Sequence, residues 1–303
     1  MNHFEKTKRY VHSGNICLAA YHWGRLDVDR ETIVLVHGYP DAADVWQLVA
    51  ERLAADFKVV AYDVRGTGLS DIPETTQGYA FDYLVQDLSQ VIQAVSPDQA
   101  VHLVGHDWGA LQAWEAVLGD RLKPQIASYT ALAPSADHVG WWFQRQLAQR
   151  NFQGYLNVAK RITASGYMAM FQMPILPELT WHLGLDKLWS TFVGYLENTT
   201  VEASPTQLRN AKSGLGLYRQ NLVKPLLNPS RRCTSIPVQM LLMNQDPFVP
   251  LSLSRGMEEW VQDIHYAEVS AGHWGILSHP QPIAEKIQQF VQSISQRRSK
   301  QIA

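Results

Sequence analysis

The sequence has few cysteines. Only Cys17 and Cys233 occur among its 303 residues. They are far apart and lack the paired spacing of zinc ligands, so the sequence predicts neither a disulfide framework nor a metal site. This composition is typical of a protein kept in a reducing compartment, and we expect a cytoplasmic location.

An excess of charge of one sign is also missing. Lys and Arg total 26 against 28 Asp and Glu, which gives a formal net charge of −2. A chain of this kind lacks the basic excess that a phosphate backbone attracts, so nucleic acid is not an expected partner. The basic residues at 297–300 are expected to form a solvated tail.

Long apolar runs are absent as well. No stretch approaches the roughly 20 apolar residues of a transmembrane helix, so no membrane span is expected. The basic N-terminal segment 1–9 is not followed by an apolar segment. We therefore expect no signal peptide.

Short β-branched apolar runs alternate with stretches of helical periodicity along most of the chain. Such runs are typical of strands buried on both faces. Strands are predicted at 32–36, 59–62, 101–104, 126–132, 238–243 and 264–269. Helices are predicted at 46–55, 81–95, 110–118 and 282–294. The alternation predicts an α/β fold with a mainly parallel, doubly wound sheet.

One long segment, 135–235, interrupts this alternation after the sixth strand. It is far too long for a loop, and its Trp, Met and Leu residues recur at helical spacing. We therefore predict a helical cap or lid domain over 135–235. Residues 1–134 and 236–303 would form the α/β core.

Asp107 is the candidate nucleophile. It stands between Gly105 and Gly109, where a predicted strand turns into a helix, and this is the context of a nucleophile elbow. The glycines permit a tight, strained turn, and the helix N-terminus stabilises a carboxylate. The competing interpretation is an ordinary helix N-cap. A carboxylate that attacks a saturated carbon gives an ester that water can hydrolyse, whereas serine would give an ether.

His273 and Asp246 are the candidate base and its orienting acid. His273 follows the last predicted strand, and Asp246 follows the strand at 238–243. The order nucleophile, acid, histidine is the one expected for the α/β-hydrolase fold. The remaining histidines near predicted strand ends are expected to be structural, namely His102, His106, His265 and His279.

The segment 37–40, with sequence His-Gly-Tyr-Pro, is the candidate oxyanion hole. The backbone N–H groups of Tyr39 and Trp108 would point to the site, and the Tyr39–Pro40 bond is a candidate cis peptide. Taken alone, the segment could equally be a plain turn. The Gly-containing loop 63–70 lacks the lysine and third glycine of nucleotide motifs, so we interpret it as scaffold.

Four segments, 37–40, 63–70, 105–109 and 272–274, together resemble the α/β-hydrolase epoxide hydrolase family. The resemblance runs from about residue 10 to residue 292. It implies that the cap segments 166–172 and 216–219 supply two ring-opening tyrosines, Tyr167 and Tyr218. Without that resemblance, ordinary core packing would explain both tyrosines.

Aromatic and sulfur-containing side chains of the cap are predicted to line an apolar pocket, although cap packing explains them almost equally well. They are Trp141, Trp142, Met168, Met170 and Met173. Of these we assign Trp141 to the substrate-binding residues, together with His37, Tyr39 and Trp108.

The stretch 135–142 and the run that starts at Met173 resemble a bacterial subgroup whose hydrolase domain is often fused to a short-chain dehydrogenase. This sequence holds no such fusion, so we carry over no redox function. Many relatives have Asn-Trp ahead of the second tyrosine, and this sequence lacks that pair before Tyr218.

These observations predict an epoxide hydrolase that converts an epoxide into a vicinal diol through a covalent aspartyl ester. The expected partners are a small apolar epoxide and water, with no metal or organic cofactor. The sequence leaves a homodimer open. The alternatives are a haloalkane-type dehalogenase with the same nucleophile, a non-catalytic binding protein of the same fold, and an esterase.

Overall fold

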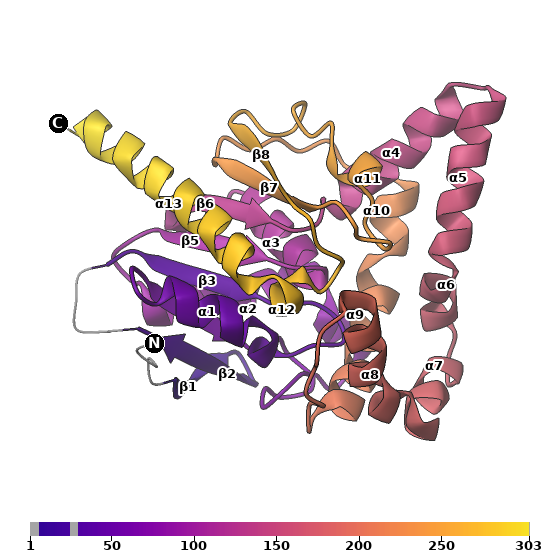
Figure 1. The fold of residues 1–303 in the computed structure, drawn as a ribbon, viewed down its shortest axis with the longest axis horizontal. Coiled ribbons are helices and arrows are strands. Elements are labelled where there is room, and N and C mark those ends of the chain that lie inside the picture. The colour runs from indigo at the N-terminus through magenta and orange to yellow at the C-terminus, as the bar shows by residue number, and fades with distance from the viewer. Residues whose placement is uncertain (1–5, 25–29, 303) are drawn as a thin grey trace.

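The computed structural model describes residues 6–24 and 30–302, and its strands form one eight-stranded sheet in the order β1-β2-β4-β3-β5-β6-β7-β8 (Figure 1). In this order, every pair of neighbouring strands from β4 to β8 is parallel. The predicted mainly parallel sheet is therefore confirmed. The strands are β1 (Thr7–Ser13), β2 (Ile16–Trp23), β3 (Thr32–Val36), β4 (Lys58–Tyr62), β5 (Val101–Gly105), β6 (Ile126–Ala131), β7 (Val238–Met243) and β8 (Ile264–Val269).

Alternate residues of the central strands supply the two apolar cores. In β3, Ile33 and Leu35 pack with α1 (Gln47–Leu53) and α13 (Pro280–Ile302). Val34 and Val36 pack with α2 (Phe81–Val95) and α3 (Trp108–Leu118) on the other face. The helices outside 135–235 are η1 (Ala43–Trp46), α1 (Gln47–Leu53), η2 (Thr76–Tyr79), α2 (Phe81–Val95), α3 (Trp108–Leu118), η3 (Lys123–Gln125), α11 (Leu251–Ser254), α12 (Gly275–Ser278) and α13 (Pro280–Ile302).

Two strands, β1 and β2, were not predicted from the sequence. They form an antiparallel hairpin in which all seven residues of β1 pair with β2. The first four residues of β1 are exposed, since β1 is the edge of the sheet. Charged residues such as Lys8 and Arg9 are common on edges because they discourage pairing with another chain, and they hide the strand pattern.

Between β6 and β7 the chain forms helices, as predicted for this segment. They are α4 (Ala136–Ala148), α5 (Phe152–Ala164), α6 (Gly166–Gln172), α7 (Leu176–Thr180), η4 (Trp181–Leu185), α8 (Asp186–Glu197), α9 (Gln207–Asn221) and α10 (Val223–Leu227). In Figure 1 they stand to one side of the sheet, beyond the loops that follow β5 and β7. The division into a core and a cap domain remains a prediction.

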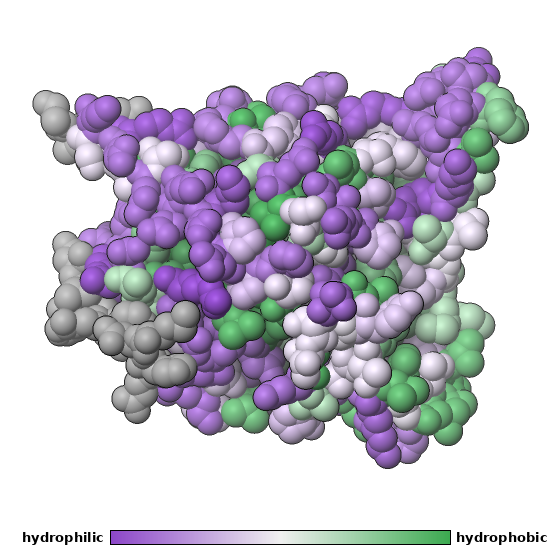
Figure 2. Space-filling model, in the orientation of Figure 1, coloured by the Kyte–Doolittle hydropathy of each residue, from purple (hydrophilic) through white to green (hydrophobic). Residues whose placement is uncertain are grey.

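The surface over α7 and α8 is rich in apolar side chains, which Figure 2 shows as green at the lower right. Ile175, Leu183 and Leu188 are among the exposed ones. Among the described residues, no helix combines the length and the apolar character needed to cross a membrane. Residues 1–5, on which part of the signal-peptide expectation rests, lie outside the described residues.

Candidate active site

Asp107 lies at the sharp turn between β5 and α3. Its φ of 51° is in the left-handed region, which a residue with a side chain adopts only when its surroundings hold it there. A Cβ on Gly109 would collide with the carbonyl of Val36, so the close approach of helix and strand requires glycine. The Asp107 side chain makes no capping hydrogen bond to α3. This geometry argues against the N-cap interpretation.

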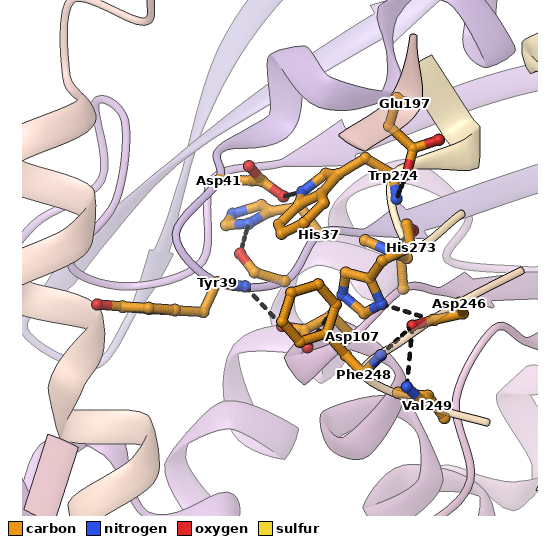
Figure 3. A network of polar contacts seen from close by, with 12 residues as sticks. His37, Tyr39, Asp41, Asp107, Glu197, Asp246, Phe248, Val249, His273 and Trp274 are labelled. Atoms are coloured by element: carbon orange, nitrogen blue, oxygen red, sulfur yellow. Dashed lines mark hydrogen bonds and ion pairs between the residues drawn. The ribbon is translucent and has the colours of Figure 1, made fainter. Parts of the chain in front are cut away.

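His273 lies between two carboxylates (Figure 3). Its Nδ1 is 2.7 Å from Oδ2 of Asp246, and its Nε2 is 3.6 Å from Oδ2 of Asp107. Asp246 also accepts hydrogen bonds from the backbone N–H groups of Phe248 and Val249, at 2.7 and 2.9 Å. The structure therefore brings together the three residues that the sequence predicted as nucleophile, base and acid.

The backbone of Tyr39 faces Asp107, and its side chain does not. The Tyr39 amide donates to Oδ1 of Asp107 at 2.8 Å, while its ring extends away toward the helices (Figure 3). That ring packs edge-on against Phe171 and Tyr218, with centroid distances of 5.4 and 5.1 Å. The predicted cis bond between Tyr39 and Pro40 is confirmed. Trp108 begins α3 directly after Asp107.

The charges of the three groups reinforce one another. Burial alone would lower the pKa of His273, but Asp246 and Asp107 outweigh it and raise this pKa to about 10. Burial raises the pKa of the Asp107 carboxyl, whereas His273, His106 and the Tyr39 amide lower it, and the net shift is downward. At neutral pH the site thus holds an ionised Asp107 beside a cationic His273.

Replacing Asp107 with Asn is expected to lower the pKa of His273, because one of the two carboxylates that raise it is removed. Titration of the imidazole by NMR would measure the change, with Asp56→Asn as a control at an exposed acid.

An unfolded histidine has a pKa of about 6.5, so the raised pKa of His273 stabilises the wild-type fold fully below pH 6.5. This stabilisation is lost as the pH rises through 10. If the pKa of His273 were the same in Asp107→Asn as in wild type, the electrostatic pairing of His273 with Asp107 would be contradicted.

Three polar side chains hold the loop that carries His273: His106, which was expected to be structural, and Glu197 and Asp41, which sequence reasoning missed. His106 contacts the carbonyl of His273 through Nε2 at 2.8 Å, and burial lowers the pKa of His106 to about 4, which keeps it neutral. Glu197 accepts from the backbone N–H of Trp274 at 2.8 Å, and Asp41 accepts from its indole at 3.1 Å (Figure 3). Burial raises the pKa of Asp41 to about 7. Asp41 directly follows the 37–40 segment, and that position was the only available sequence signal.

The two predicted tyrosines lie on α6 and α9, and the charge of Asp107 affects the pKa of both. Burial raises the pKa of Tyr167, and the charge of Asp107 raises it further. The pKa of Tyr218 is also raised by burial, then by Tyr167 and Asp107. Both phenols therefore stay protonated at neutral pH. The Tyr218 ring packs on Trp108 with a centroid distance of 4.7 Å.

Hydrogen bonds fix α6 against α9. Gln172 on α6 donates to the carbonyl of Tyr218 at 2.9 Å. Arg219 on α9 donates to the carbonyls of Phe171 and Met173 at 3.2 and 2.7 Å, and it pairs with Glu178 at 2.6 Å. These contacts hold the segments that carry Tyr167 and Tyr218 against each other, although the two segments are far apart in the sequence.

A cavity of about 400 Å³ lies beside Asp107. Tyr167, Met168 and Trp108 are in its wall. Most other lining side chains are apolar, and they include Leu111, Val139, Phe143, Ile162, Leu222, Val223, Leu226, Phe248, Val249 and Leu253. An apolar cavity with a few polar groups at one end is typical of a small-molecule site.

Several predicted pocket residues are not in the cavity wall. Trp141 donates its indole N–H to the carbonyl of Ser230, and it does not line the cavity. His37 is turned toward the 63–70 loop, where its Nε2 accepts from the backbone N–H of Val64 at 2.9 Å. Neither side chain is among the residues that line this cavity, so a role for either in substrate binding stays a prediction. Five Trp and Met residues of the cap were predicted to line the pocket, and of these only Met168 is among the described residues that line the cavity.

Comparison with known proteins identifies the fold family. A family model described as alpha/beta hydrolase fold matches residues 31–280. The chain belongs to this family. The crystal structure of a Bacillus megaterium epoxide hydrolase in complex with an inhibitor is similar to this α/β-hydrolase fold chain, with a TM-score of 0.74 and 26% identity. That match covers 94% of this chain and 100% of the other.

Curated relatives of this α/β-hydrolase fold chain include proteins named as epoxide hydrolases. "Epoxide hydrolase 3" of Xenopus tropicalis is 25% identical over 282 residues, which cover 88% of this chain and 72% of that protein. "Probable oxidoreductase EphD" of Mycobacterium tuberculosis (strain ATCC 25618 / H37Rv) is 31% identical over 285 residues, which cover 90% of this chain and 47% of that protein. The chain thus spans about half the length of the EphD relative. The resemblance to epoxide hydrolases is confirmed.

Proposed function

We propose that this protein is an epoxide hydrolase that forms a vicinal diol through a covalent ester on Asp107. The observation that carries the proposal is that a carboxylate nucleophile and a protonated phenol, Tyr167, line one apolar cavity. The similarity to epoxide hydrolases supports it. In this proposal the helices of 135–235 form a cap domain that supplies both tyrosines.

The first step opens the ring. Oδ2 of Asp107 attacks an oxirane carbon, the carbon–oxygen ring bond breaks, and the ring oxygen takes a proton from Tyr167 or Tyr218. Oδ1 remains held by the Tyr39 amide and becomes the ester carbonyl oxygen. The product is a hydroxyalkyl ester of Asp107. Its formation removes a negative charge that raises the pKa of His273, so the imidazolium can give up its proton, which returns to the phenolate, and the neutral histidine can then act as a base.

The second step hydrolyses that ester. His273 takes a proton from water, whose oxygen attacks the Asp107 carbonyl carbon, and Asp246 stabilises the imidazolium. The amides of Tyr39 and Trp108 would hold the oxyanion. The ester bond then breaks and the diol oxygen receives the proton from His273. The second proton of the water passes from the Asp107 carboxyl to His273, which restores the carboxylate and the imidazolium. Overall, one water is added across the epoxide.

A single turnover in H₂¹⁸O tests the proposal. Water attacks the carbonyl of the ester, so the first diol oxygen comes from Asp107 and the label enters the Asp107 carboxylate. With protein in excess over an aromatic or aliphatic terminal epoxide, we expect unlabelled diol and ¹⁸O in the peptide that contains Asp107, measured by mass spectrometry. Labelled diol from the first turnover would show direct attack by water and contradict the ester mechanism.

A further inference from the structure

Arg161 is a buried cation that no described residue of the protein pairs with. It lies on α5, where its side chain is only 8% exposed. Across residues 6–24 and 30–302 its guanidinium makes no hydrogen bond and no ion pair, and its Nε is buried and unsatisfied. Other arginines of low exposure are paired: Arg65 binds Asp87, Arg219 binds Glu178, and Arg232 binds Glu115.

Arg161 lines the same cavity as Asp107 and Tyr167. Its charge acts on Tyr167, since it lowers the pKa of that phenol against the larger effect of burial. Asp107 is not the partner of Arg161 in this structure: its carboxylate accepts from the Tyr39 amide and lies 3.6 Å from His273. A buried charge without a partner is costly to folding, so a ligand that supplies the partner accounts for its retention.

Apart from Asp107, Arg161 and a few other polar groups, the cavity wall is apolar, and this limits the chemistry of the ligand. Ile162, the next residue, also lines the cavity and is 60% exposed, so this part of α5 reaches the surface. One planar guanidinium matches one carboxylate in both charge and geometry, whereas a phosphate dianion would bring more charge than a single arginine balances.

We propose that Arg161 binds the carboxylate of the substrate, an epoxide on an aliphatic acid. The carbon chain of that acid fills the apolar cavity and places the oxirane at Asp107. This inference rests on the proposed epoxide hydrolase function. Arg161 is then a specificity-determining residue that takes no part in the bond changes.

Terminal epoxides of straight-chain fatty acids, each compared with its methyl ester, test the proposal, because the ester removes the charge and keeps the chain. Wild type is expected to favour the acid in kcat/KM, mostly through KM. Arg161→Met should lower kcat/KM for the acid about 10- to 100-fold, the usual value of a charged hydrogen bond, and should lower that for the ester much less. Arg161→Lys should retain part of the preference.

Arg145→Met is the matched control. Arg145 lies on α4 outside the cavity, is 42% exposed and pairs with Glu259, so its loss should leave the acid-to-ester ratio unchanged. Thermal unfolding checks the fold: removal of an unpaired buried charge should leave the melting temperature of Arg161→Met unchanged or raised. A lowered melting temperature, or an acid-to-ester ratio equal to that of wild type, would overturn the assignment.

Binding of decanoate, measured by calorimetry, separates this inference from the proposed function because it needs no epoxide chemistry. Wild type should bind decanoate, and Arg161→Met should not. If decanoate binds through Arg161 but no epoxide is opened, the proposed function fails alone. If epoxides are opened without an acid preference and decanoate does not bind, the Arg161 inference fails alone. Arg161-dependent binding of decyl phosphate in preference to decanoate would overturn the choice of a carboxylate.

Discussion

His273→Gln is expected to stop the reaction at the covalent ester, so that protein carrying one substrate molecule accumulates. In the proposed mechanism, opening of the ring requires the carboxylate of Asp107 and a proton from a phenol, and neither comes from His273. Hydrolysis of the ester in that mechanism requires His273, because its Nε2 is 3.6 Å from Oδ2 of Asp107 and is placed to take a proton from a water beside the ester carbonyl. Intact-protein mass spectrometry after incubation with an epoxide would show the added mass.

Asp107→Ala is the control for this experiment, and it should form neither adduct nor diol. Peptide mapping of the His273→Gln adduct should place the added mass on Asp107. An unchanged mass in His273→Gln, together with continued diol formation in Asp107→Ala, would show that Asp107 is not the nucleophile. Because loss of the paired charge also affects the fold, thermal unfolding should accompany both variants.

The double variant Tyr167→Phe, Tyr218→Phe is expected to be nearly inactive toward epoxides, while each single variant slows alkylation about 10²-fold. An epoxide leaves as an alkoxide, a strong base that needs a proton, and both phenols are held protonated by burial and by the charge of Asp107. Two donors near one site should partly replace each other. Stopped-flow measurement of the alkylation rate would resolve the single variants from the double variant.

A matched bromoalkane distinguishes epoxide opening from dehalogenation, the main alternative with the same nucleophile. Bromide leaves as a stable anion and needs no proton, so its release should respond far less to the loss of the two phenols. Tyr195→Phe is a suitable control, since Tyr195 is 85% exposed on α8. Bromide release faster than diol formation in wild type, or a double variant that opens epoxides at the wild-type rate, would overturn the assignment as an epoxide hydrolase.

The parts of the site that could be predicted from the sequence are those set by local rules. Asp107 and Asp246 follow the buried strands β5 and β7, His273 follows β8, and parallel strands bring their carboxyl ends to one edge of a sheet. Strand-to-loop position therefore indicated that these three side chains meet before any distance was known. The cis bond at Pro40 was likewise a local property of the 37–40 turn.

The tertiary structure decided where side chains distant in sequence point. His37 belongs to the 37–40 segment and Trp141 to the stretch 135–142, and both were predicted to bind substrate. Their hydrogen bonds to Val64 and Ser230 instead direct the two side chains away from the cavity. The direction of a side chain depends on which partner satisfies its polar atoms, and that partner is set by packing and not by spacing.

Arg161 shows the same limit most clearly. In the sequence it is one of two basic residues on the amphipathic helix α5, and such residues are usually solvated. Only the folded chain shows that it is buried in the wall that also holds Asp107 and that none of the described residues pairs with it. Sequence periodicity indicated the strands β3 to β8 and the place of the helical insertion, and strand ends indicated the order of Asp107, Asp246 and His273. Burial and the pairing of charges, which depend on contacts between distant segments, were decided by the tertiary structure alone.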